Sequence, residues 1–223
     1  MLKRTMYKIN GACVTAGFMV LGPIQNNVYF ITDGAATFVV DPTCDPDALV
    51  EALGGVKLDA IVITHRHYDH IGAAARLAQR MGATVIASEI DAPYIAGELP
   101  DPDGHPGSDP CPVDQRVSDG DVVQLGGMAW RVISTPGHTP GSMCLFLDPR
   151  FGSDAAGAPL LISGDTLFCG SIGRTDFAGG SMDDMRHSLK KLATLPDNTI
   201  VLPGHNDLTT IAAERERTFA YYA

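Results

Sequence analysis

The sequence is poor in positive charge. Its 16 Lys and Arg residues are outnumbered by 26 Asp and Glu residues, which gives a formal net charge of -10 and a pI near 4.9. Recognition of nucleic acid or of an anionic membrane surface normally relies on a basic patch. We therefore expect neither a nucleic acid nor a membrane as a partner.

Paired cysteines are also missing. The five Cys residues are an odd number, and no CxxC pair occurs among them. This pattern predicts neither a disulfide framework nor a zinc knuckle. A reducing cytoplasm is therefore the expected location.

Long apolar runs are absent as well. No stretch approaches the roughly 20 apolar residues that span a bilayer. Lys3 and Arg4 precede a mixed apolar stretch and resemble the start of a secretory signal, which is the alternative to a cytoplasmic location. Polar and Gly residues interrupt that stretch and no A-x-A cleavage site follows, so the sequence favours the cytoplasm.

What the sequence does contain is a regular alternation of short apolar strands and helices. Its 223 residues, 45% of them hydrophobic, are compatible with one domain over residues 1–223 and one large core. Strands are expected at 13–21, 28–32, 37–41, 60–64, 83–87, 121–125, 128–134, 142–147, 159–163 and 199–202. Helices are expected at 46–54, 71–82, 88–97, 182–194 and 209–219. Two halves of mixed strand direction predict an α/β fold with two sheets face to face and helices outside.

One segment lacks either pattern. Residues 97–117 include five prolines and few apolar side chains, so we expect an irregular loop. Its length makes it a candidate lid.

A cluster of metal-ligand residue types follows the buried strand at 60–64. The segment THRHYDH at 64–70 places His65, His67, Asp69 and His70 within six positions. In an extended turn, alternate side chains point the same way, so His65 and His67 can bind one ion, while Asp69 and His70 face a second. The alternative is a solvated turn without a ligand.

Three further residues of these types lie in loops beside Gly or Pro at strand ends. They are His138 in STPGHTPGS, Asp165 in LISGDTLF and His205 in VLPGH. Each residue alone is weak evidence for a metal ligand, since a single His is more often structural. Loops at strand ends are, however, where functional sites are commonly built. Together, five His and two Asp fit one site for two divalent metal ions.

The order of these motifs resembles the metallo-β-lactamase superfamily over essentially the whole chain. The resemblance implies a four-layer αββα sandwich with the metals at one edge of the two sheets. It assigns His65, His67 and His138 to one metal, Asp69, His70 and His205 to the other, and Asp165 as the bridge. Asp69 is also the candidate catalytic residue. A bridging Asp suits zinc, which is favoured, and also iron or manganese.

Within this superfamily, GDTLFCGSIGRTDFAGG at 164–180 is most similar to the hydroxyacylglutathione hydrolases (glyoxalase II) of the short prokaryotic type. The segment PGHNDLTTIAAERER at 203–217 resembles the same group. Arg174 matches a position where that family directs a basic residue toward the substrate carboxylate; the alternative is an ion pair with Asp176. Asp41 resembles an aspartate that orients a ligand imidazole from outside the metal, although an Asp before Pro42 is also an ordinary turn starter.

The chemistry expected of such a site is hydrolysis by water. Two ions can share a hydroxide, because coordination brings the pKa of water from about 15.7 to near 7. No GxSxG elbow occurs, and a thiolate leaving group needs little acid catalysis, so a small thioester such as S-lactoylglutathione fits as substrate. The alternatives are a persulfide dioxygenase with one iron, a lactone or phosphoester hydrolase, and a catalytically silent metal-binding module. We expect a monomer or small homo-oligomer.

Overall fold

The computed structural model of the protein describes residues 5–105, 108–149 and 157–223. Lys3 and Arg4, on which the alternative of a secretory signal depends, lie outside these residues. Among the helices described here, none combines the length and the apolar character needed to cross a bilayer.

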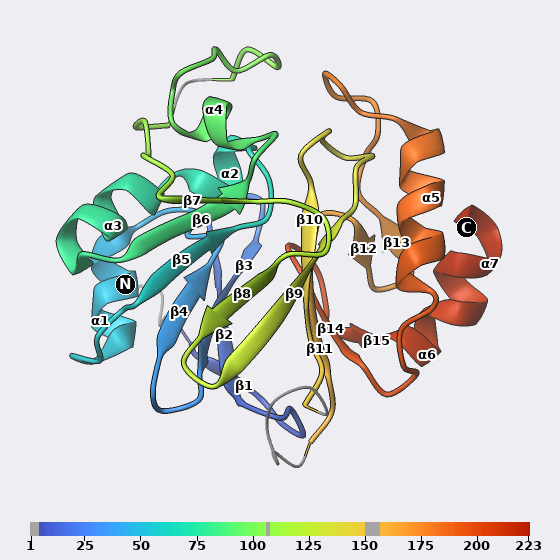
Figure 1. The fold of residues 1–223 in the computed structure, drawn as a ribbon, viewed down its shortest axis with the longest axis horizontal. Coiled ribbons are helices and arrows are strands. Elements are labelled where there is room, and N and C mark those ends of the chain that lie inside the picture. Colours follow the sequence, from blue (N-terminus) through green and yellow to red (C-terminus); the bar gives the residue numbers. More distant parts are fainter. Residues whose placement is uncertain (1–4, 106–107, 150–156) are drawn as a thin grey trace.

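Two large sheets face each other in the centre of the molecule (Figure 1). The first sheet has the order β1-β2-β3-β4-β5-β6-β7 and the second has the order β15-β14-β11-β10-β9-β8. The first is formed by Tyr7–Ile9 (β1), Thr15–Leu21 (β2), Asn26–Thr32 (β3), Thr37–Val40 (β4), Ala60–Ile63 (β5), Thr84–Ser88 (β6) and Gln115–Val117 (β7). The second is formed by Val122–Leu125 (β8), Met128–Ser134 (β9), Met143–Leu147 (β10), Leu160–Gly164 (β11), Ile200–Pro203 (β14) and Thr209–Thr210 (β15). A small hairpin of Leu167–Phe168 (β12) and Ser171–Ile172 (β13) lies beside the second sheet.

The space between the sheets is filled by one apolar cluster. Both sheets contribute to it, and the rings of Phe38 and Trp130 meet edge to face across it, with centroids 5.5 Å apart. Both of these side chains have 0% exposure. Burial of this apolar surface, together with the edge-to-face ring pair, favours the packing of the two sheets.

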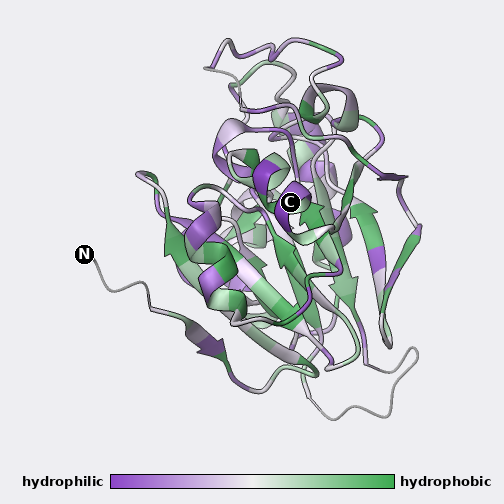
Figure 2. Ribbon diagram, turned by 90° about the vertical axis from the view of Figure 1, so that its left-hand side faces the viewer, coloured by the Kyte–Doolittle hydropathy of each residue, from purple (hydrophilic) through white to green (hydrophobic). Residues whose placement is uncertain are grey.

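Helices cover the outer face of each sheet. The first sheet packs against α1 (Pro46–Leu53), α3 (Ala74–Met81) and α4 (Ala92–Ile95), and the second packs against α5 (Met182–Leu192) and α6 (Ile211–Glu214) (Figure 1). In Figure 2 the strands are largely hydrophobic, whereas the helices also carry hydrophilic residues. This arrangement gives the layers α, β, β and α, and it confirms the predicted four-layer sandwich.

The segment 68–81 forms two helices, so the helix predicted over 71–82 was wrong at its start. The first, α2 (Tyr68–Ile71), ends at Gly72, and α3 starts after it. A Cβ at Gly72 would lie 2.2 Å from the carbonyl oxygen of Thr43, so only Gly allows the backbones to approach here. The break keeps Asp69 and His70 on a short turn of helix beside the sheet edge.

Other boundaries also differ from the prediction. The strand β1 was missed, the helix expected at 88–97 is only the four residues of α4, and the predicted loop 97–117 ends in β7. The helix expected at 209–219 is α6 followed by a π-helical turn, Arg215–Phe219 (η1), and by α7 (Ala220–Tyr222). These elements are short and depend on tertiary packing, which local sequence patterns do not encode.

Candidate metal centre

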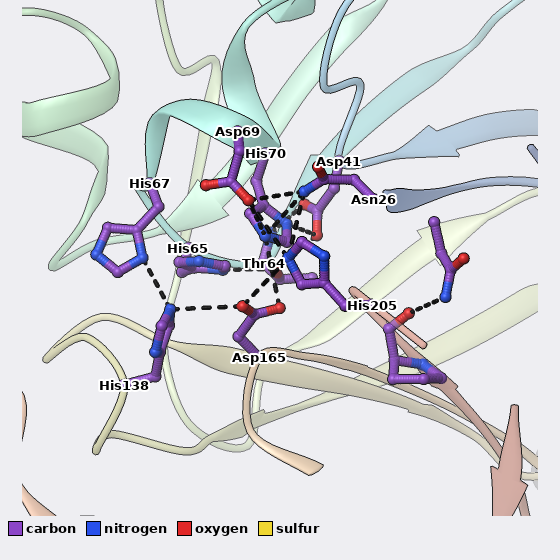
Figure 3. Close-up of polar contacts among 12 residues, drawn as sticks. Asn26, Asp41, Thr64, His65, His67, Asp69, His70, His138, Asp165 and His205 are labelled. Carbon is purple, nitrogen blue, oxygen red and sulfur yellow. Dashed lines mark hydrogen bonds and ion pairs between the residues drawn. The ribbon is translucent and has the colours of Figure 1, made fainter. Parts of the chain in front are cut away.

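The candidate ligands lie at the same edge of both sheets because they follow the carboxyl ends of strands. In the first sheet, β4 and β5 run parallel, and the THRHYDH segment follows β5. In the second sheet, β11 and β14 run parallel, and β9 has the same direction because both β9 and β11 are antiparallel to β10. The loops after these strands therefore open at one edge, where His138, Asp165 and His205 are found (Figure 3).

Two backbone hydrogen bonds connect the sheets beside the site. The N–H of Met143 donates to the carbonyl of Thr64 over 3.0 Å, and the N–H of Asn27 donates to the carbonyl of Gly204 over 2.8 Å. Both bonds join the first sheet to the second, so they fix the relative position of loops that are far apart in sequence.

The first group of donors consists of three buried histidines. His65, His67 and His138 each offer a ring nitrogen, and these three atoms lie within 4.8 Å of one another. Nδ1 of His67 lies only 2.8 Å from Nε2 of His138. The sequence and its family resemblance predicted that these three residues would converge, and the structure brings them together.

The second group consists of Asp69, His70 and His205. Their donor atoms also lie within 4.8 Å of one another. Oδ2 of Asp69 is 3.3 Å from Nε2 of His70 and 3.3 Å from Nε2 of His205. These are the residues that the family resemblance placed in one group.

Asp165 lies between the two groups. Its Oδ2 is 3.6 Å from Nε2 of His138 and 3.5 Å from Nε2 of His205, and its Oδ1 is 3.5 Å from Nε2 of His70 (Figure 3). One carboxylate thus faces donors of both groups, which is the position predicted for a bridge.

The orientation of His65 and His70 is set by Asp41. Nδ1 of His70 lies 2.9 Å from Oδ2 of Asp41. The hydroxyl of Thr64 donates to the same Oδ2 over 2.7 Å, so its oxygen is left to accept from Nδ1 of His65, 3.0 Å away. Both rings therefore direct their Nε2 lone pairs away from Asp41 and into the site.

Backbone carbonyls orient two other histidines in the same way. Nδ1 of His138 lies 2.7 Å from the carbonyl oxygen of Arg174, and Nδ1 of His205 lies 3.1 Å from that of Ile24. A carbonyl only accepts, so these Nδ1 atoms carry the protons and each Nε2 faces the site as an acceptor.

This arrangement fits a metal ion, because the side chains present hydrogen-bond acceptors to the site and almost no N–H or O–H groups. Within the described part of the chain, Nε2 of His65 and Oδ1 of Asp165 are buried without a hydrogen-bond partner. In the second group, a side-chain donor among the described residues is Nδ2 of Asn26, which lies 2.7 Å from Asp69 Oδ2 and 3.4 Å from Nε2 of both His70 and His205. Imidazole and carboxylate donors in this number suit zinc, iron or manganese.

The pKa values of the histidines shift in opposite directions in the two groups. Burial, followed by the neighbouring imidazoles, lowers the pKa of His67 to about 4 and holds the pKa of His65 well below its ordinary value. Burial also lowers the pKa of His138. In the second group burial acts in the same direction, but the surrounding carboxylates outweigh it and raise the pKa values of His70 and His205.

Two glycines make room for these side chains. A Cβ at Gly173 would lie 1.9 Å from the carbonyl oxygen of Asp165, and one at Gly204 would lie 2.3 Å from Oδ1 of the same residue. Gly173 belongs to the GSIGRTDF segment and Gly204 to the PGH motif. Their small size allows the Asp165 loop to pack against the neighbouring backbone.

Asn26 and the pair Arg66 and Asp91 were not singled out from the sequence. Nη1 of Arg66 lies 3.0 Å from Oδ1 of Asp91, with side-chain exposures of 4% and 0%. Asp91 Oδ2 also accepts from the backbone N–H of Arg66 and from the hydroxyl of Thr139. A single buried Asp or Asn among ordinary strand and turn residues gives no local signal, although Arg66 stands inside the THRHYDH motif.

The two residues with open interpretations now have observed contacts. Asp41 makes the contact with His70 that orients a ligand ring, and it does so with a φ of 48°. The guanidinium of Arg174 forms two hydrogen bonds of 2.8 Å with Asp176, which is the ion pair considered as the alternative to a substrate contact. The substrate contact of Arg174 stays a prediction.

The fold and the convergence of His and Asp donors define a class of protein, the αββα metallohydrolases. The sequence profile of the metallo-beta-lactamase superfamily matches residues 21–205. The chain therefore belongs to the metallo-β-lactamase superfamily, and the predicted resemblance is confirmed.

Individual relatives cover most of the chain. The chain is similar to the hydroxyacylglutathione hydrolase GloC of Haemophilus influenzae, with 30% identity over 198 residues, 86% of this chain and 90% of GloC. It is also similar to the B3 metallo-beta-lactamase BLEG-1, whose crystal structure gives a TM-score of 0.78 with 31% identity and covers 92% of this chain and 98% of BLEG-1. The crystal structure of TTHA1623 in a di-iron-bound form gives a TM-score of 0.73 with 32% identity. The match covers 89% of this chain and 96% of TTHA1623.

Proposed function

We propose that this protein is a binuclear metallohydrolase that cleaves a small thioester of the S-lactoylglutathione kind. The observation that supports two ions is the position of Asp165, whose carboxylate faces His138 on one side and His70 and His205 on the other. The name of the relative GloC supports a hydroxyacylglutathione as the type of substrate.

In this proposal, His65, His67 and His138 hold one ion, and Asp69, His70 and His205 hold the other. Bound ions would lower the pKa of water and polarise the carbonyl of the substrate. Asp69 is the candidate catalytic side chain. Burial opposes its ionisation, but the charge of His70, followed by the contacts with His205 and Asn26, keeps its pKa far below the usual range. Asp69 therefore accepts hydrogen bonds and supplies negative charge, and it does not donate a proton.

The identity of the metals is part of the proposal. Imidazole and carboxylate ligands accommodate zinc, and the di-iron form of TTHA1623 supports iron as an alternative. Zinc remains our first choice, and manganese also suits the donor set.

Arg174 is the proposed contact for the carboxylate of the thiol part of the substrate. Its side chain is 65% exposed, and its guanidinium lies 4.3 Å from the centroid of the Phe177 ring. That ring in turn contacts His67, with centroids 5.0 Å apart. We expect Arg174→Ala to raise KM for an anionic thioester more than for a neutral one. Asp176→Ala is the matched control, because it removes the ion pair and keeps the cation.

The main experiment measures metal content and then activity on one preparation. Protein purified without added metal is analysed for zinc, iron and manganese, and then assayed with S-lactoylglutathione. Two ions per chain with thioester cleavage support the proposal. Two ions without cleavage defeat the substrate and leave the metal centre standing, and lactones and phosphoesters are then tested.

The rival with a different reaction is the persulfide dioxygenase with one iron. A single iron per chain, together with oxygen uptake on glutathione persulfide, would exclude the hydrolase. The complete second group of Asp69, His70 and His205 favours two ions over one.

A further inference from the structure

One of the five candidate histidine ligands is turned the opposite way. The other four direct Nδ1 to an acceptor outside the site, over distances of 2.7 to 3.1 Å, and present Nε2 to the site. His67 instead presents Nδ1, which faces Nε2 of His138 at 2.8 Å. Its Nε2 therefore points outward and needs an acceptor of its own if Nδ1 is to remain an unprotonated donor to metal.

The group that Nε2 of His67 faces is Asp103, in the proline-rich loop 97–117. Oδ2 of Asp103 lies 3.5 Å from this nitrogen, and the two side chains are 6% and 7% exposed. Neither atom has a hydrogen-bond partner elsewhere among the residues that the structure describes. Two buried polar atoms that face each other without another hydrogen-bond partner are destabilising unless they pair, because burial removes the water that would otherwise bond to them.

Asp103 is held in place by contacts with the loop that follows Asp165. Its Oδ1 accepts the backbone N–H of Ala178 over 2.7 Å, and the carbonyl of Ala178 accepts from Nη2 of Arg66 over the same distance. Nη2 of Arg66 also lies 4.0 Å from Oδ2 of Asp103. The carboxylate is thus anchored on one oxygen, and the other oxygen faces His67.

We propose that Asp103 is a positioning residue of the metal centre, which accepts the Nε2–H of His67 and so fixes the tautomer whose Nδ1 binds metal. The role of the proline-rich loop is then to supply the hydrogen-bond acceptor for Nε2–H of His67. Outer-shell partners of this type set ring orientation and ligand basicity, and their loss typically lowers metal affinity by about 10- to 100-fold. The proposal concerns metal binding and does not depend on the identity of the substrate.

The test compares two variants of Asp103 with a control from the same loop. Asp103→Ala removes the acceptor and is expected to lower the affinity for the first metal by about 10- to 100-fold. In Asp103→Asn, the amide oxygen stays on the N–H of Ala178, so the NH₂ group faces Nε2 of His67 and favours the tautomer protonated on Nδ1. We therefore expect Asp103→Asn to bind metal at least as poorly as Asp103→Ala. Asp109→Ala, which removes an exposed partner of Arg76, is expected to bind as the original protein does.

Zinc affinity is measured by competition with a chromophoric chelator, and the tautomer of His67 is measured by ¹⁵N NMR of the metal-free proteins. A role limited to anchoring the loop predicts that Asp103→Asn, which keeps the bond to Ala178, resembles the original protein; that result would overturn the proposal. Unchanged zinc affinity in Asp103→Ala would also overturn it. If the original protein bound no metal, the metal centre itself would be refuted, which is a distinguishable result.

Discussion

Oδ2 of Asp41 lies 2.9 Å from Nδ1 of His70, and the same oxygen accepts the hydroxyl of Thr64, which in turn contacts His65. One carboxylate therefore orients a histidine in each of the two donor groups. Asp41 follows β4, a strand that contributes none of the seven candidate ligands. The geometry of both groups thus depends on a residue outside the seven candidate ligands.

Replacing Asp41 by Ala is expected to weaken metal binding by both groups of candidate ligands. Affinity for each metal should fall by about 10- to 100-fold, because His70 and His65 lose their fixed orientation. Loss of the acceptor for the buried N–H of Thr64 should also cost about 1–3 kcal/mol of stability. Chelator competition and urea unfolding measure the two effects. The control is Asp59→Ala, which removes the acceptor of the Thr37 N–H away from the site and should lower stability without changing metal affinity.

The buried pair of Arg66 and Asp91 is expected to contribute far more to stability than exposed pairs. Asp91→Ala removes the nearest carboxylate from a guanidinium whose side chain is 4% exposed and leaves Nη1 without its acceptor, so the free energy of unfolding should fall by about 3–5 kcal/mol. Glu98→Ala breaks the exposed pair with Arg116 and should change it by about 1 kcal/mol or less. Urea denaturation of both variants tests the contrast. Similar losses of unfolding free energy in the two variants would show that the buried pair stabilises the protein no more than the exposed pair does.

Gly204→Ala tests the packing around the bridging carboxylate. The added Cβ would lie 2.3 Å from Oδ1 of Asp165 and 2.7 Å from Cε1 of His70, so both ligands must shift. We expect a loss of metal from both groups and a stability loss of about 1–3 kcal/mol from overpacking. Gly127→Ala is a suitable control, since its Cβ would meet Oδ2 of the exposed Asp33 at 3.2 Å, away from the candidate ligands. Full metal content in Gly204→Ala would contradict this role of Gly204.

Lowering the pH should remove the two metals in sequence. A ligand imidazole must be neutral to bind, so protons compete with metal only below its pKa in the metal-free protein. The pKa values of His70 and His205 are raised, whereas those of His65, His67 and His138 are lowered, that of His67 to about 4. As the pH falls from 8 toward 5, the metal of Asp69, His70 and His205 should be lost first. Metal content after gel filtration at each pH measures this, and simultaneous loss of both ions would be the contrary result.

The candidate ligands could be predicted from the sequence because each stands in a short motif at a strand end. The fold followed from the alternation of apolar segments for a similar reason. Asn26, Asp91 and Asp103 could not be predicted, because their contacts join residues that are far apart in the chain. Asn26 and Asp69, for example, are separated by 43 positions. Such pairs depend on how the two sheets and the loop 97–117 pack together, and no local sequence pattern predicts that packing.

The site also spans the two halves of the sandwich. His65, His67, Asp69 and His70 come from the loop and short helix after β5 in the first sheet, whereas His138, Asp165 and His205 come from the second. Neither half has enough donors for both ions, so bound metal would act as a cross-link that a chelator can remove. The rate at which the halves separate during unfolding would then depend on the concentration of free metal, and metal supply would set the lifetime of the folded protein as well as its activity.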